Sequence, residues 1–148
     1  MMNRPTRITI HCSATKPQFD VGVHEIREWH MDRGFSDVGY HYVIRRDGTV
    51  EKGRPAHRRG AHVQGHNTKN LGICLVGGVN QKGNAQANYT TDQWHALRLL
   101  VIELVGRYGI PLSNIQGHRD FPRVNKECPC FDVKEWLDND LFPKPDMI

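Results

Sequence analysis

The sequence predicts a single α/β domain over residues 1–148, with a central mixed β-sheet flanked by α-helices. A chain of 148 residues fits one domain. Segments rich in β-branched residues alternate along it with segments of helical periodicity. An unbroken apolar run over residues 71–77 is typical of a central strand buried on both faces.

The first half of the chain predicts a strand, a helix and a hairpin. Residues 7–11 alternate, so Ile8 and Ile10 should face one side, and His11 the other with Arg7 and Thr9. A helix is expected over residues 21–33, capped by Asp20, ended by Gly34, and with an apolar stripe of Val23, Ile26, Trp29 and His30. A strand over residues 39–46 should place Tyr40, Tyr42 and Ile44 on one face, before a hairpin turn at Asp47-Gly48.

The second half predicts a long loop and a long helix. Residues 54–70 are polar and aperiodic, and loops of that length in compact domains are usually functional. Thr90-x-x-Gln93 is a capping-box pattern that opens a helix ended by Gly109. A short strand within residues 110–116 and a closing helix over residues 132–138 complete the chain.

Composition bounds the class of protein. Charged residues are 24% and hydrophobic residues 38%, as in globular domains. The net charge of +4 suggests anionic surroundings such as cell wall, membrane surface or nucleic acid, or equally a solvated basic surface without a specific partner. No apolar run reaches the ~18 residues of a membrane span, and the start has no apolar segment of a secretory signal. We therefore expect synthesis in the cytosol, where thiols stay reduced.

The loop over residues 117–132 gathers an imidazole, a lysine and two thiols, at His118, Lys126, Cys128 and Cys130. Imidazole and thiolate are ligands that Zn²⁺ prefers, and a catalytic zinc has three protein ligands. Because one loop supplies at most two of them here, His11 is the best candidate for the third. The spacing matches no short metal motif, so a scatter of unrelated histidines stays open from residue types alone.

Five segments carry a resemblance to a known family: residues 11–17 (HCSATKP), 37–41 (DVGYH), 46–50 (RDGTV), 72–78 (GICLVGG) and 126–132 (KECPCFD). In them the chain resembles the zinc-dependent N-acetylmuramoyl-L-alanine amidases, above all the small amidase-type lysozymes, or endolysins, of tailed bacteriophages. Peptidoglycan recognition proteins share this fold. The likeness covers nearly the whole chain in the right order, so it implies one zinc amidase domain.

The resemblance implies a ligand set and an activity. His11, His118 and Cys128, which directly precedes a proline, match the family's ligands for one zinc ion per chain. The expected reaction is hydrolysis of the amide between N-acetylmuramic acid and L-alanine of bacterial peptidoglycan. Tyr40 would orient or deprotonate the attacking water or stabilise the tetrahedral intermediate, and Lys126 would stand near the developing oxyanion.

The long loop should line the substrate groove. We expect His62, His66, Asn67 and Asn70 to contact the stem peptide or sugar, although a merely solvated polar loop is about equally supported. Cys130 departs from the serine that close phage relatives often carry. In one phage relative the amino-terminal arm helps to bind and inhibit the phage RNA polymerase, and the short arm here argues against that role. A monomer is expected, which reaches the cell wall through a separate membrane-permeabilising protein.

Three other functions compete with the amidase. A module of the same fold could bind peptidoglycan without cutting it, but the full set of ligands with Tyr40 and Lys126 argues against this. A thiol hydrolase using Cys128 or Cys130 with a histidine would need no metal, so it would resist chelators. A nucleic-acid binder has least support, because no basic stripe with interleaved aromatic residues is present.

Overall fold

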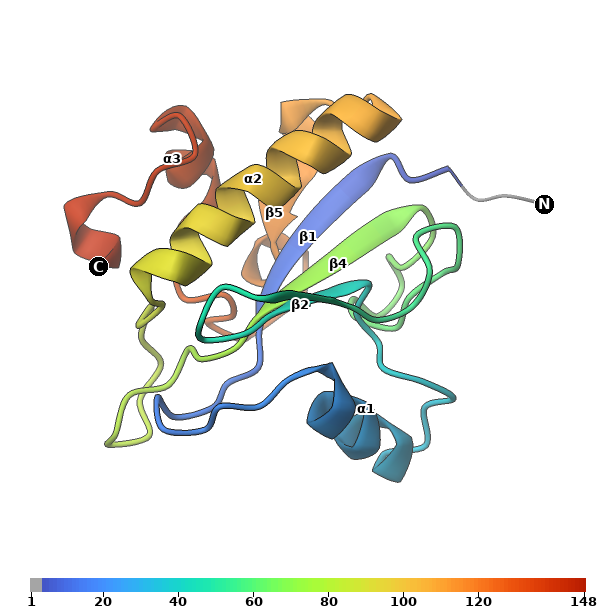
Figure 1. The fold of residues 1–148 in the computed structure, drawn as a ribbon. Coiled ribbons are helices and arrows are strands. Elements are labelled where there is room, and N and C mark those ends of the chain that lie inside the picture. Colours follow the sequence, from blue (N-terminus) through green and yellow to red (C-terminus); the bar gives the residue numbers. More distant parts are fainter. Residues whose placement is uncertain (1–3) are drawn as a thin grey trace.

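The computed structural model describes residues 4–148, so the first three residues of the amino-terminal arm lie outside the described part (Figure 1). The elements follow in the order β1 (Arg7–Cys12), α1 (Val23–Asp32), β2 (Tyr42–Ile44), β3 (Val50–Lys52), β4 (Asn70–Leu75), α2 (Thr91–Tyr108), η1 (Leu112–Asn114), β5 (Ile115–Gly117), η2 (His118–Asp120), α3 (Val133–Asp138) and η3 (Pro145–Met147).

The strands form one mixed sheet in the order β3-β2-β4-β1-β5. β2, β4, β1 and β5 are parallel, and β3 returns antiparallel to β2 after the turn at Asp47-Gly48. Every residue of β4 is buried, as expected for a central strand of a parallel sheet. The predicted mixed sheet, the hairpin and the buried central strand are therefore confirmed.

Helices cover both faces of the sheet (Figure 1). α2 and α3 pack on one face in a large apolar cluster that includes Ile8 and Ile10 of β1 and Trp136 of α3. α1 packs on the other face in a smaller cluster of Ile26, Val38, Val43, Cys74 and Val76. Because side chains alternate along a strand, β1 turns Thr9 and His11 toward the α1 face.

The start of α2 is tied to the sheet by its cap. Thr90 Oγ1 accepts the Gln93 N–H at 3.1 Å, and Gln93 Oε1 accepts the Thr90 N–H at 3.0 Å, which confirms the capping box. The fully buried Gln93 amide also donates to the carbonyl oxygens of Ile44 and Val76. α2 ends at Gly109, which adopts a left-handed conformation with φ of 66°.

The prediction for α1 was wrong in two details. The N-cap is Gly22 and not Asp20, because the Glu25 carboxylate accepts the Gly22 N–H at 2.7 Å and Glu51 accepts the Val23 N–H at 2.8 Å. Asp20 instead lies 3.5 Å from the Arg45 guanidinium. Trp29 is 41% exposed and does not belong to the inward stripe.

Tyr40 also differs from its prediction. The strand begins only at Tyr42, so Tyr40 is not in register with Tyr42 and Ile44. Those two side chains join the α2 face, whereas Tyr40 packs against the α1-side cluster. This places the phenol on the same side of the sheet as His11.

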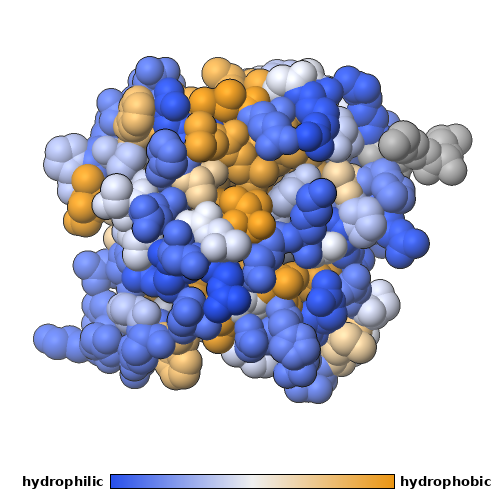
Figure 2. Space-filling view, viewed as in Figure 1, coloured by the Kyte–Doolittle hydropathy of each residue, from blue (hydrophilic) through white to orange (hydrophobic). Residues whose placement is uncertain are grey.

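Apolar residues are most concentrated over one part of the surface in the view of Figure 1. Figure 2 shows apolar residues over the upper part of this view, where α2 crosses the sheet, and mostly hydrophilic residues below. Leu99 and Ile102 of α2 are 50% and 46% exposed. Within the described residues, no helix combines the length and apolar character that crossing a membrane requires.

Candidate metal centre and pocket

The register of the sheet brings two histidines from distant parts of the chain together. Ile10 of β1 lies opposite Gly117 of β5, so the residues that follow them, His11 and His118, are neighbours. Their ring centroids are 4.6 Å apart. Ligand sites gather beyond the carboxyl ends of parallel strands, and both histidines lie at such ends.

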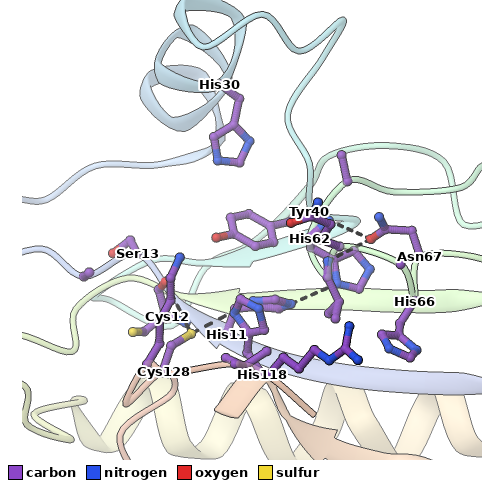
Figure 3. A pocket seen from close by; sticks show the side chains of 18 of the residues that line it. His11, Cys12, Ser13, His30, Tyr40, His62, His66, Asn67, His118 and Cys128 are labelled. Atoms are coloured by element: carbon purple, nitrogen blue, oxygen red, sulfur yellow. Dashed lines mark hydrogen bonds between the residues drawn. The ribbon is translucent and has the colours of Figure 1, made fainter. Parts of the chain in front are cut away.

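Cys128 completes the group from the loop after β5 (Figure 3). One ligand atom each from His11, His118 and Cys128 lies within 4.8 Å of the others. Cys128 Sγ is 4.0 Å from His11 Nδ1 and accepts the Cys12 backbone N–H at 3.1 Å. The Arg119 N–H donates to the Cys128 carbonyl oxygen at 2.8 Å, which ties the loop to the turn that carries His118.

Cys130 points elsewhere. Its thiol donates to the Gly78 carbonyl oxygen at 3.4 Å, and it is not among the grouped ligand atoms. The two thiols of this loop therefore contact different parts of the backbone, Cys128 at Cys12 and Cys130 at Gly78.

The histidines are held neutral by burial. Burial, followed by the charges of His62, His118 and Lys126, lowers the pKa of His11 well below its usual value. Burial lowers the pKa of His62 to about 3, and burial and then Lys126 lower the pKa of His118. Neutral imidazole and sulfur donors at one point fit Zn²⁺, and all three residues line a pocket.

A pocket of about 1380 Å³ opens over the three ligands. Pockets for small molecules usually have ~300–1,000 Å³, so this one has room for a segment of a larger substrate. Among the described residues that line it, three are cationic, Arg33, Arg123 and Lys126, and none is acidic. The wall is therefore suited to a substrate that bears carboxylates.

Tyr40 lies between His11 and His30, with ring-centroid distances of 5.1 Å and 5.3 Å (Figure 3). Burial raises the pKa of Tyr40 well above its usual value. This direction favours the protonated phenol, which can donate a hydrogen bond into the pocket.

The residues expected in the substrate groove are divided between two places. His62, His66 and Asn67 line the pocket, whereas Asn70 is buried beneath it and accepts the Thr9 hydroxyl at 2.8 Å. His62 is only 8% exposed and has its polar atoms engaged by protein groups. The long loop thus contributes buried residues that hold the pocket in place as well as residues that line it.

Sequence reasoning missed several residues of the pocket wall, among them His30, Arg33 and Arg123. His30 is the only polar member of the inward stripe of α1, and its Nδ1 accepts the Gly39 N–H at 2.8 Å. The position of His30 as a polar residue on an otherwise apolar helix stripe was the sequence signal for its role. Arg33 and Arg123 had no comparable sequence signal, because their place on the rim of the pocket depends on tertiary structure.

Comparisons with known proteins agree with this geometry. The sequence profile of the family described as N-acetylmuramoyl-L-alanine amidase matches residues 1–131. An endolysin of Klebsiella phage KP32 is 50% identical over 131 residues, which cover 88% of this chain and 84% of the relative. The amidase LysC from Clostridium intestinale has a TM-score of 0.76 at 29% identity, covering 95% of this chain and 87% of that one. Drosophila PGRP-LB, at 23% identity, shares the fold with a TM-score of 0.73, covering 100% and 88%.

The buried histidines predict how the stability of the zinc-free protein depends on pH. The unfolded chain takes up protons on its histidines near pH 6.5, whereas the folded chain does not while their pKa values are lowered. The free energy of unfolding should therefore fall as the pH drops from about 6.5, and continue to fall toward the pKa of His62.

Denaturant unfolding between about pH 7.5 and pH 5 measures this dependence above the range in which carboxylates titrate. The His62→Asn variant should show a shallower fall, and His95→Asn, at an exposed position on α2, should keep the parent slope. A flat profile for the parent protein would contradict the expectation.

Proposed function

We propose that this chain, which belongs to the N-acetylmuramoyl-L-alanine amidase family, holds one zinc ion through His11, His118 and Cys128 in a single domain of 148 residues. It hydrolyses the amide bond between N-acetylmuramic acid and L-alanine in bacterial peptidoglycan, as a phage endolysin. The observation that carries the zinc proposal is the convergence of three soft donors beneath a pocket with a cationic wall.

Zinc at this site would supply a Lewis acid that polarises the amide carbonyl and lowers the pKa of an attacking water molecule. Tyr40 orients or deprotonates the attacking water, or stabilises the tetrahedral oxyanion. Burial raises the pKa of the Tyr40 phenol, which favours the roles in which its hydroxyl donates a hydrogen bond.

Lys126 supplies positive charge to the same space. Its ammonium is close enough to the ligands to lower the pKa values of His11 and His118. A negative charge that develops on the substrate oxygen is stabilised by such a cation when the pocket is filled and water is displaced. Lys126 is exposed on the loop after η2 and lines the pocket.

The wall of the pocket suits the stem peptide. Arg33 and Arg123 lie on the rim without an acidic neighbour among the lining residues, and stem peptides carry free carboxylates. His66 and Asn67 offer polar contacts from the long loop. We assign His62 and Asn70 to support beneath this surface. We further propose that the protein acts as a monomer and reaches the wall through a separate membrane-permeabilising protein.

One distance in the site is also compatible with a thiol mechanism. Cys128 Sγ lies 4.0 Å from a ring nitrogen of His11, which is also compatible with a thiol–imidazole pair. Digestion of purified peptidoglycan followed by mass spectrometry decides between the two. We expect release of peptides that begin with L-alanine, and loss of this release when a chelator is present. Undiminished cleavage after metal removal would favour the thiol mechanism, and cleavage at another bond would refute the amidase.

The two thiols of the loop should differ in their effect on the metal. Cys128→Ser should lose both zinc and activity, since a hydroxyl replaces the only sulfur in the ligand group. Cys130→Ser is the matched control two residues away, and it should keep about one zinc per chain, because its thiol bonds to Gly78. Metal analysis of both variants tests this, and the reverse pattern would overturn the assignment.

Tyr40 and Lys126 should affect turnover without affecting the metal. Tyr40→Phe and Lys126→Ala should each lower kcat and kcat/KM together, by ~10²–10³-fold for the loss of one oxyanion donor. Zinc content should stay near the parent value, because neither group is a usual zinc ligand.

Controls for these variants are Tyr108→Phe on α2 and Lys82→Ala on a distant exposed loop. Turnover on purified peptidoglycan and zinc stoichiometry are measured for all four proteins. Parent-like turnover in both site variants would refute the assigned roles, and lost zinc in either would identify a structural residue.

A further inference from the structure

We infer that His62 is a positioning residue that fixes the tautomer of His11, and thereby makes His11 Nδ1 the atom that faces the metal. The inference rests on the zinc site proposed above. It assigns to His62 a role on the ligand and not on the substrate.

A backbone carbonyl fixes the proton of His62. His62 Nε2 lies 2.7 Å from the Asn70 carbonyl oxygen, which can only accept a hydrogen bond. His62 Nε2 must therefore carry a proton. Because His62 is 8% exposed, burial favours its neutral form, in which Nδ1 has a free lone pair.

That lone pair faces His11. His62 Nδ1 lies 2.9 Å from His11 Nε2, and the two rings meet edge to face with centroids 4.9 Å apart. Because His62 Nδ1 can only accept in this tautomer, His11 Nε2 must donate. The remaining lone pair of His11 is then on Nδ1, the atom 4.0 Å from Cys128 Sγ.

The opposite tautomer of His11 would be costly. It would set two lone pairs against each other across 2.9 Å and aim an N–H at the other ligands. His11 is 1% exposed, so solvent cannot take over the lost hydrogen bond. Metal-binding histidines in general have their second nitrogen engaged in this way, which orients the ring.

The chain also holds the His62 backbone and one face of its ring. Asn67 Oδ1 accepts the backbone N–H groups of His62 and Val63, both at 2.8 Å. On β4, Gly72 faces the ring, and a Cβ at that position would lie 2.7 Å from its Cδ2 and Cγ atoms. The ring is therefore seated between the long loop and a strand that leaves room for it.

His41 provides a control within the same protein. Its Nδ1 accepts the Gly72 N–H at 3.0 Å and its Nε2 donates to the Arg58 carbonyl oxygen at 2.7 Å. It has the same tautomer and similar burial as His62, but it is not part of the ligand group.

The test uses ¹⁵N NMR of the imidazole rings in the zinc-free protein, together with zinc affinity measured against a competing chelator. In the parent protein, His11 and His41 should both carry their proton on Nε2. In His62→Leu, which keeps bulk but removes both polar atoms, the His11 tautomer should become mixed while His41 is unchanged. Zinc affinity should fall by ~10–100-fold, the usual effect of losing a partner of a ligand.

Two further variants separate positioning from stability. His62→Asn places an amide oxygen near the former Nδ1 position, so it should recover most of the zinc affinity although the bond to Asn70 is lost. His41→Leu also loses two buried hydrogen bonds, and it should be less stable but bind zinc like the parent. A purely structural role of His62 would make affinity follow stability in all three variants.

Two results would overturn the inference: a proton on His11 Nδ1 in the parent protein, or parent-like zinc affinity in His62→Leu. Failure of the parent to bind zinc would instead refute the proposed metal site. The tautomer of His11, read without metal, would still decide the inference in that case.

Discussion

The parallel register of β1 with β5 is the constraint on which the site depends. Ile10 pairs with Gly117, and the next residue of each strand is a histidine, so two ligands separated by most of the chain become neighbours. A shift of one residue would turn His11 to the α2 face and its apolar cluster. β1 lies between β4 and β5 and has buried residues along nearly its whole length, so a strand that is paired on both sides carries the ligand.

One face of the sheet carries the large apolar core, and the other face carries the candidate site. The α2 face is apolar, and the two buried side-chain nitrogens without a partner among the described residues, the indole nitrogens of Trp94 and Trp136, belong to it. The α1 face beside the pocket buries Thr9, His11, His62 and Asn70, and each has a hydrogen-bond partner within the protein. Buried polar groups are tolerated when they are paired in this way.

Local patterns in the sequence predicted the elements well, because each depends on neighbours in the chain. The alternation of β1, the capping box at Thr90 and the glycine that ends α2 are such signals. The start of α1 was misplaced because Glu51, from another strand, helps to cap it. For the site, residue types and family resemblance indicated the three ligands that the fold groups together. The support given by His62 was not predictable, because it depends on a contact across 51 positions of sequence.

The paired polar groups around His11 bear on whether the protein needs metal in order to fold. Small zinc domains such as zinc fingers fold only when the ion binds, so that metal and structure arrive together. At His11 the orienting contacts are strand pairing and a hydrogen bond to His62, and both are made between protein groups. We therefore expect the fold of this chain to depend on metal less than the fold of a zinc finger does, so that removal of the ion would cost activity before it costs structure.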